Sequence, residues 1–248
     1  MRLSRLFIDT PFIIGQEVVL PKDSAHYLLN VIRLRVGATV IVFNGQGGEY
    51  VARLITATKK NALLQIDEHK EIERESSLSL TLVQAISRPE HFSYTLQKSV
   101  ELGVKHIIPV ITKNSPPLDK NKMNIRKQHW RKIIIGACEQ CGRNRLPLLD
   151  DALPLKTWLI QSQSESQSEY KLILSPTGEH NLYETIRQNK LDKITMLIGA
   201  EGGLSETEMQ EAMQAGYLDI RLGPRVLRTE TASVAILAIC QAWAGDLK

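Results

Sequence analysis

Cysteine is scarce in this chain of 248 residues, which carries only Cys138, Cys141 and Cys240. A small and odd number of cysteines argues against a disulfide framework. Cys138 and Cys141 are spaced as C-x-x-C, but no second cysteine pair or nearby histidine pair completes the ligands of a zinc site. The pair also falls late in a predicted helix, whereas a redox pair opens one. We therefore expect no metal site and interpret the pair as small helix residues.

Long apolar runs are absent as well. The longest, Val234–Cys240, is far shorter than the ~20 residues that a membrane-spanning helix needs. The segment Met1–Arg5 lacks the apolar stretch of a signal peptide. Hydrophobic residues make up 43% and charged residues 23%, near the averages of globular proteins, so the chain can bury a core. We expect a cytoplasmic protein with no membrane partner.

Positive charge is concentrated in two segments. Residues 113–145 hold nine Lys and Arg against two Asp and Glu, net +7, and residues 1–70 carry +3, whereas residues 146–248 carry −5. Basic segments suit a polyanion such as RNA, although a solvated helix face explains them equally well. Aromatic residues are only 5% of the chain, so base stacking should be a minor theme.

Residues 1–70 are predicted to form a small β-rich domain. Ala38–Phe43 is a β-branched run that ends in the turn signal Asn44-Gly45, and Tyr50–Thr56 and Ala62–Ile66 are further short strands. One helix is expected between Ser24 and Leu34. Short strands with glycine-rich turns fit a small barrel.

Residues 71–77 are charged, lack apolar periodicity and form the predicted linker. From residue 78 to residue 248 strands and helices alternate, which indicates an α/β domain with a parallel sheet. The expected strands are Leu80–Ile86, His106–Ile111, Leu172–Leu174, Ile194–Ile198 and Leu218–Leu222.

Helices are expected between these strands. One begins at Ser87-Arg88-Pro89-Glu90, which has the spacing of a capping box, and ends near Leu102. A long helix covers about Lys122 to Gly142, and Ser205 to Glu208 is a second capping box. The last helix, Thr229 to Ala244, is apolar on most sides, so we expect it to be buried.

Glycine and proline mark three strand ends in the C-terminal half, at residues 174–178, 198–204 and 222–231. Ligands bind beyond the carboxyl ends of the strands in an open parallel sheet. Glycines there allow close backbone approach to a ligand, although tight turns alone would also use them. The first strand of this domain is followed by Ser87-Arg88-Pro89 and lacks a G-x-G-x-x-G pattern, so nicotinamide or flavin binding is disfavoured.

The segments Ile198–Gly203 and Leu222–Ala232 together resemble the signature of the 16S ribosomal RNA uridine N3-methyltransferases, which belong to the SPOUT class. Residues 97–104 and 139–143 also match, and Arg2–Phe7 with His26 and Arg33-Leu34 resembles the family's PUA-like RNA-binding barrel. The similarity spans nearly the whole chain. The chain departs from the family's usual pattern at Ala200, near Glu90 and over Lys113–Leu118.

The resemblance implies a PUA-like barrel over residues 1–70 and a SPOUT domain over residues 78–248 with a C-terminal trefoil knot. The cofactor would be S-adenosylmethionine, with S-adenosylhomocysteine as product and no metal. The substrate would be N3 of a uridine in 16S rRNA, in the assembled small subunit, and the enzyme would be a homodimer. The residues expected to hold the cofactor are Leu174, Ser175, Pro176, Ile198, Gly199, Glu201, Gly202, Gly203, Leu222, Gly223, Val226, Leu227, Arg228, Thr231 and Ala232.

Methyl transfer to N3 requires loss of a weakly acidic proton. Arg228 is our first candidate for stabilising the resulting anion, because it lies at a cofactor turn. Glu139, Glu201 and Glu230 are candidates for the base or for orienting Arg228. A first-turn carboxylate favoured by the helix dipole explains Glu230 equally well.

Basic residues of both domains are candidates for contacts to RNA phosphates, which would make binding fall steeply with salt. Arg143 fits either a phosphate or the partner subunit. The set is Arg2, Arg5, Arg33, Arg35, Lys59, Lys60, Arg88, Lys98, Arg126, Arg143 and Arg145.

Two other functions remain open at this point. Another methyltransferase of the same class could act on tRNA or on a ribose 2′-oxygen, and analysis of the product would separate it. A non-catalytic RNA-binding or ribosome-assembly factor would use the barrel without turning over S-adenosylmethionine. The glycine turns and Arg228 argue against this second function.

Overall fold

The computed structural model of the protein describes residues 3–58, 61–117, 119–162, 170–187 and 192–248. The chain divides into two compact units, one of residues 1–75 with 138–146, the other of residues 76–137 with 147–248. The domain boundaries expected from the sequence stay a prediction. The structure adds that residues 138–146, which follow most of a long helix, belong with the N-terminal unit.

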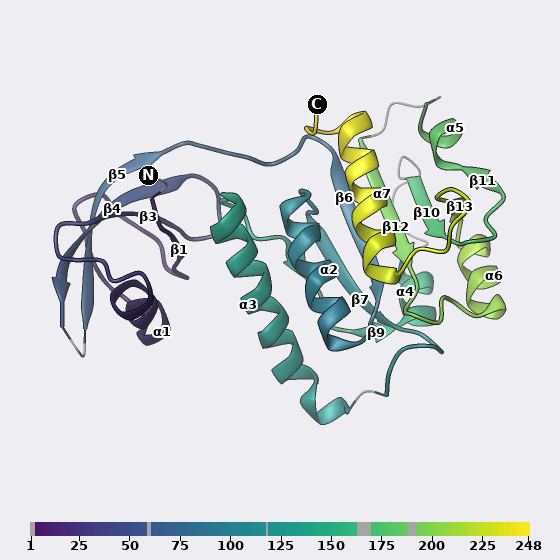
Figure 1. The fold of residues 1–248 in the computed structure, drawn as a ribbon, viewed down its shortest axis with the longest axis horizontal. Coiled ribbons are helices and arrows are strands. Elements are labelled where there is room, and N and C mark those ends of the chain that lie inside the picture. Colours follow the sequence, from purple (N-terminus) through teal and green to yellow (C-terminus); the bar gives the residue numbers. More distant parts are fainter. Residues whose placement is uncertain (1–2, 59–60, 118, 163–169, 188–191) are drawn as a thin grey trace. The chain divides into compact units, whose positions relative to one another are not determined.

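The first unit is built on a five-stranded sheet in the order β1-β3-β4-β5-β2 (Figure 1). Its strands are β1 (Arg5–Phe7), β2 (Glu17–Val19), β3 (Thr39–Phe43), β4 (Glu49–Ala57) and β5 (Ala62–Lys70). The three strands predicted from the sequence, β3, β4 and β5, are antiparallel neighbours, whereas β1 pairs with β3 in parallel. The short strands β1 and β2 were not predicted, because three residues carry too little periodicity.

A helical segment covers the core of this unit. It consists of α1 (Lys22–His26) and one π-helical turn (Tyr27–Val31), where the sequence predicts a single helix. Leu28 is fully buried and packs with Leu54 and Leu64 from the strands. Residues 71–77, all described, form neither helix nor strand.

The second unit is an α/β domain, which confirms the predicted fold class. Its eight-stranded sheet has the order β11-β13-β10-β12-β6-β7-β8, with β9 also pairing β7, and every pairing is parallel. The strands are β6 (Ser79–Ala85), β7 (His106–Ile111), β8 (Leu148–Leu149), β9 (Leu153–Pro154), β10 (Tyr170–Leu174), β11 (His180–Asn181), β12 (Lys193–Ile198) and β13 (Leu218–Arg221).

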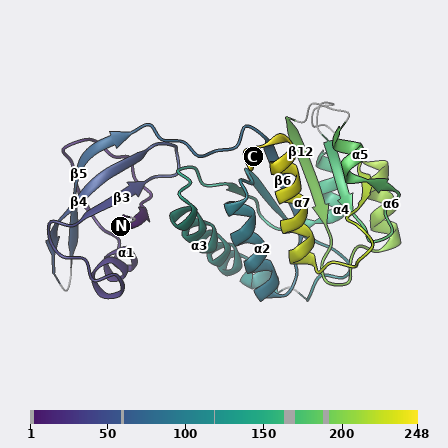
Figure 2. The ribbon, with the colours of Figure 1, turned by 45° about the horizontal axis from the view of Figure 1, so that its top comes forward.

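Helices cover both faces of this sheet (Figure 2). Helices α2 (Pro89–Glu101) and α7 (Thr229–Ala244) pack together on one face. On the other face, α4 (Leu155–Gln161) and α6 (Glu206–Gln214) contact each other over a core that includes Val83, Ile108 and Leu197. The remaining helices are α3 (Met123–Cys141), preceded by a 3-10 turn at Lys120–Lys122, and α5 (Leu182–Arg187).

The start of α2 differs from the expectation. Ser205 and Glu208 form the predicted capping box of α6, but the one predicted at Ser87–Glu90 is wrong. Arg88 is the N-cap of α2, and no side chain of the described residues caps it there. A proline in the first turn presets the backbone and donates no N–H, so less capping is needed.

Helix α7 is buried on one side only. Leu237 and Cys240 are fully buried, whereas Ile239 is 42% and Trp243 is 43% exposed. The expected burial of this helix therefore holds for the face toward the sheet and α2. Within the described residues, none of the helices is both long and apolar enough to cross a bilayer. The trefoil knot stays a prediction.

Candidate cofactor-binding site

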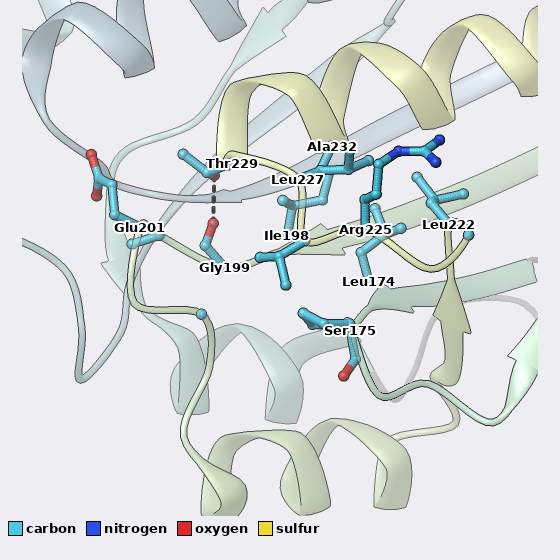
Figure 3. Close-up of a pocket in the computed structure, with 15 residues that line it drawn as sticks. Leu174, Ser175, Ile198, Gly199, Glu201, Leu222, Arg225, Leu227, Thr229 and Ala232 are labelled. Carbon is cyan, nitrogen blue, oxygen red and sulfur yellow. Dashed lines mark hydrogen bonds between the residues drawn. The ribbon is translucent and has the colours of Figure 1, made fainter.

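A pocket opens where β10, β12 and β13 end, at the edge of the sheet where parallel strands place their ligands (Figure 3). Glu201 lies at one end of the pocket and Leu222 at the other. The space between its walls and at its mouth, part of which is open to solvent, is about 630 Å³. The lining residues are Leu174, Ser175, Pro176, Ile198, Gly199, Ala200, Glu201, Gly203, Leu222, Gly223, Arg225, Val226, Leu227, Thr229 and Ala232.

Most residues that the sequence suggested for the cofactor lie together in this lining. Among the described residues, Gly202, Arg228 and Thr231 were expected there and lie outside it. Ala200, Arg225 and Thr229 line the pocket and were not expected. Thr229 could have been found from its place at the start of the last helix, beside Arg228.

Backbone geometry explains the glycines of the pocket. Gly203 has φ +68° and Gly223 has φ +75°, a region that favours glycine. A Cβ on Gly199 would lie 2.8 Å from the backbone carbon of Gly203, so the chain segments there approach each other too closely for a side chain. The glycine turn thus brings backbone groups to the pocket instead of side chains.

Polar contacts hold this turn from outside the pocket. Asn114 donates from Nδ2 to the carbonyl oxygens of Gly202 and Gly203, at 2.8 and 3.1 Å. The Arg88 backbone N–H donates to Glu201 Oε1 at 2.9 Å. Glu201 therefore links the glycine turn to the start of α2.

The start of α7 forms another edge of the pocket. Thr229 donates from its hydroxyl to the Gly199 carbonyl oxygen at 2.6 Å, which joins α7 to the end of β12 (Figure 3). Arg228 is the exposed N-cap residue of this helix. Its position at the turn agrees with the sequence, although its side chain is not part of the lining.

Glu230, in the first turn of α7, is paired with His91 of α2, with 2.9 Å between Oε2 and Nδ1. Burial alone would raise the pKa of Glu230. The hydrogen bond with His91 and the nearby charges of His91 and Arg228 outweigh that effect, so the pKa lies below its ordinary value. A carboxylate with a lowered pKa is a weaker base, and the catalytic role expected for Glu230 stays a prediction.

Glu139 lies in the first unit, where it accepts a hydrogen bond from the Phe7 backbone N–H at 2.9 Å. Burial raises its pKa, while the Phe7 N–H and the Arg5 charge act in the opposite direction. Glu139 and the pocket belong to different units, so the catalytic role expected for Glu139 stays a prediction.

The structure also corrects two of the expected RNA contacts. Arg5 and Arg143 have side chains only 7% and 5% exposed, and they pair with Glu49 and Glu75. Buried, paired guanidinium groups cannot reach phosphates without losing those partners.

The other basic candidates differ in exposure. Lys98 pairs with Glu101 and Arg145 with Glu73. Arg33, Arg35 and Arg88 are exposed, and Arg126 is half-buried. Arg2, Lys59 and Lys60 lie outside the described residues.

Two of the three cysteines, Cys138 and Cys240, are buried thiols that resist ionisation. Burial raises the pKa of the Cys138 thiol to about 12 and that of Cys240 to about 12. Within the described residues, no group of three or more His, Cys, Asp and Glu side chains is placed to hold a metal ion.

Several known proteins are similar to this chain in sequence and in fold. The family model described as RNA methyltransferase domain matches residues 74–241, and the model described as RNA methyltransferase PUA domain matches residues 20–67. Ribosomal RNA small subunit methyltransferase E of Buchnera aphidicola (subspecies Acyrthosiphon pisum) is 32% identical over 251 residues, which cover 100% of this chain and 96% of that protein.

Two solved structures are similar over their whole length. Ribosomal RNA small subunit methyltransferase E of Neisseria gonorrhoeae, bound to S-adenosylmethionine, has a TM-score of 0.90 and 35% identity, with 100% of both chains covered. A protein of Legionella pneumophila, also with bound S-adenosylmethionine, has a TM-score of 0.92 and 36% identity, again with 100% of both chains covered. The resemblance found in the sequence is confirmed: this chain belongs to the RNA methyltransferase family, with its PUA domain and its α/β methyltransferase domain.

Proposed function

We propose that this protein transfers the methyl group of S-adenosylmethionine to N3 of a uridine in the 16S rRNA of the small ribosomal subunit. The pocket at the ends of β10, β12 and β13 is the observation that carries the proposal. Relatives with the same fold hold S-adenosylmethionine, and one of them is named for the ribosomal small subunit. We further propose a cytoplasmic homodimer that acts on the assembled subunit.

The lining fits an adenosine-containing ligand. Leu174, Ile198, Leu222 and Leu227 supply an apolar surface, and the tight turn around Gly199 presents backbone N–H and C=O groups. Small-molecule sites typically combine such apolar walls with a few fixed polar groups. Hydrogen bonds from Asn114 to Gly202 and Gly203 and from Thr229 to Gly199 hold this turn in the absence of a ligand.

When bound, the cofactor supplies a methyl group on a sulfonium. In the transfer, the bond from N3 to the methyl carbon forms as the bond from sulfur to that carbon breaks. The electron pair of the broken bond stays on sulfur, and the N3 proton leaves to a base. We assign the stabilisation of the uridine anion to Arg228, whose exposed side chain lies at the start of α7, next to Thr229 of the pocket lining. Glu230, held charged by His91, orients that guanidinium.

Radiolabelled methyl transfer tests the proposal. Purified small subunits and naked 16S rRNA are incubated with the protein and labelled S-adenosylmethionine, and the product nucleoside is identified. We expect N3-methyluridine with the wild-type protein and at least a roughly 100-fold lower rate with Arg228→Ala, the size typical for loss of one anion-stabilising donor. Lys156→Ala, on an exposed lysine of α4, is the control and should leave the rate unchanged.

Other outcomes would point elsewhere. A 2′-O-methylated product, or labelling of tRNA alone, would contradict N3 methylation of 16S rRNA. Absence of S-adenosylmethionine binding would favour an assembly factor instead.

A further inference from the structure

A polar side chain is buried behind the pocket, where an apolar one would be expected. Gln84, near the end of the central strand β6, is fully buried. Its Nε2 lies 3.0 Å from Thr229 Oγ1, and its Oε1 accepts a hydrogen bond from Ser233 Oγ at 2.7 Å. Thr229 in turn donates to the carbonyl oxygen of Gly199 at 2.6 Å. The network therefore connects β6, α7 and the end of β12.

The surroundings of Gln84 determine which way its amide points. Carbonyl oxygens of Ala85 and Gly199 lie 3.2 and 3.4 Å from Nε2. A flipped amide would bring Oε1 against these oxygens, with acceptor facing acceptor, so the nitrogen belongs on this side. In this orientation Nε2 donates to the Thr229 hydroxyl oxygen, so the Thr229 hydroxyl donates its own proton to the Gly199 carbonyl oxygen.

Two residues of the network line the pocket, and the other two support them from the interior. Gly199 and Thr229 line it, whereas Gln84 and Ser233 lie behind them, both fully buried. Ser233, one helical turn after Thr229, holds the far side of the Gln84 amide. Hydrogen bonds in a dry interior are directional and costly to leave unmade, so this network fixes the distance between α7 and the glycine turn.

We propose that Gln84 and Ser233 are positioning residues for the cofactor pocket, acting through the Thr229 hydroxyl on the carbonyl group of Gly199. The proposal rests on the proposed function only in naming S-adenosylmethionine as the ligand. Loss of the Thr229 hydroxyl removes the shortest hydrogen bond of the Gly199 carbonyl and of Gln84 Nε2, and leaves only the longer bonds of Nε2 to Gly199 at 3.4 Å and to Ala85 at 3.2 Å. The start of α7 and the glycine turn then move relative to each other, and the pocket loses its preformed shape.

Calorimetric binding of S-adenosylmethionine and of S-adenosylhomocysteine to the full chain is the test. Thr229→Val keeps the shape of the side chain and removes its hydroxyl, and we expect binding about tenfold weaker, the size of one buried hydrogen bond. Thr229→Ser keeps the hydroxyl and should bind within about threefold of wild type. Gln84→Leu should match Thr229→Val, and the double variant should bind no more weakly than the worse single variant, because the residues act as one unit.

A matched control is available in α2. Thr95 is fully buried, and its hydroxyl has no hydrogen-bond partner among the described residues. Thr95→Val should therefore leave cofactor binding unchanged. Should Thr229→Val fail to fold, Ser233→Ala removes the support of the Gln84 amide more mildly and should still weaken binding, by about threefold.

The outcomes separate the two proposals. Equal affinity of wild type and Thr229→Val, with a lower melting temperature, would show that the network only stabilises the fold and would overturn the inference. Equal loss in Thr229→Val and Thr229→Ser would also overturn it, because the hydroxyl would then be irrelevant. Absence of binding by the wild-type protein would instead defeat the proposed function, and the inference with it.

Discussion

Arg143 and Glu75 form a two-point ion pair inside the first unit. The distance from Arg143 Nε to Glu75 Oε1 is 2.9 Å and from Nη2 to Oε2 is 2.6 Å. Their side chains are 5% and 14% exposed. The pair ties the segment after α3 to the residues before the second unit, and bidentate geometry makes it one of the stronger kinds of ion pair.

Arg143→Ala should therefore destabilise the protein, because it leaves the Glu75 carboxylate buried without its partner. We expect a loss of about 3 kcal/mol in the free energy of unfolding, measured by urea denaturation. Arg53→Ala is the control, since Arg53 pairs with Asp67 on an exposed surface, and little change is expected there. A stable Arg143→Ala protein with weakened RNA binding would instead restore Arg143 as an RNA contact.

The ion pairs of Glu49 predict that the protein becomes less stable in acid. Glu49 accepts hydrogen bonds from Arg5 and Arg74, with Nη1–Oε2 distances of 2.5 and 3.2 Å. Burial would raise its pKa, but the hydrogen bonds and charges of the two arginines lower it below the ordinary value of 4.5. The unfolded chain has the ordinary value, so Glu49 stabilises the fold above that pH, and the contribution is lost as the pH falls through the lower, folded pKa.

Glu49→Gln should accordingly be less stable than wild type at pH 7 and lose less stability on acidification. The measurement is urea denaturation between pH 7 and pH 3 for both proteins. Identical pH dependence in the two proteins would show that Glu49 is not responsible for any acid sensitivity.

The burial of Glu139, in the same unit, predicts a contribution to stability that is lost as the pH rises. Burial raises its pKa above the ordinary 4.5, against the smaller effects of the Phe7 N–H and Arg5. The folded protein then holds the proton to higher pH than the unfolded chain, so stability falls as pH rises from 4.5 through the folded pKa. Glu139→Gln still offers an oxygen to Phe7 and should gain stability over wild type at pH 7 but not at pH 4. A loss of stability at pH 7 would contradict this account.

Local patterns in the sequence were sufficient for the longer strands and for most residues that line the pocket. The β-branched run at residues 39–43 and Gly203, with its positive φ, follow their own backbone preferences, and Gly199 is needed because of Gly203, four positions later, so short stretches of sequence identify them. Thr229 lies beside the candidate Arg228, but its hydrogen bond to Gly199, thirty residues away in the chain, could not be inferred from the sequence. Nothing near Thr229 in the sequence indicates that partner.

Contacts between residues far apart in the sequence show the same limit more clearly. Arg143 and Glu75 are separated by 68 positions and Phe7 and Glu139 by 132. From the sequence alone, a basic segment has the same appearance whether its arginines face phosphates or buried carboxylates. The burial of Arg5 and Arg143 is a property of the folded unit, so the expected RNA surface is reduced to the exposed residues such as Arg33 and Arg35.

Gly199→Ala tests whether the glycine turn is needed for the cofactor. The added methyl group would lie 2.8 Å from the Gly203 carbonyl carbon and 3.0 Å from the Leu204 nitrogen. Both are backbone atoms, so a rotamer change cannot relieve the contact and the turn itself must move. We expect S-adenosylmethionine binding at least about tenfold weaker, measured by calorimetry, because strain of this kind costs about 1–3 kcal/mol.

Gly136→Ala provides the comparison within the same chain. Gly136 lies in α3, and among the described residues nothing is within 4 Å of a Cβ placed there. Alanine in a helix interior is more stable than glycine by about 0.5–1 kcal/mol, so this variant should be slightly more stable and bind the cofactor as wild type does. If Gly199→Ala bound S-adenosylmethionine as tightly as Gly136→Ala does, the close approach of Gly199 to Gly203 would not be needed for cofactor binding. The pocket's affinity would then have to come from its apolar side chains.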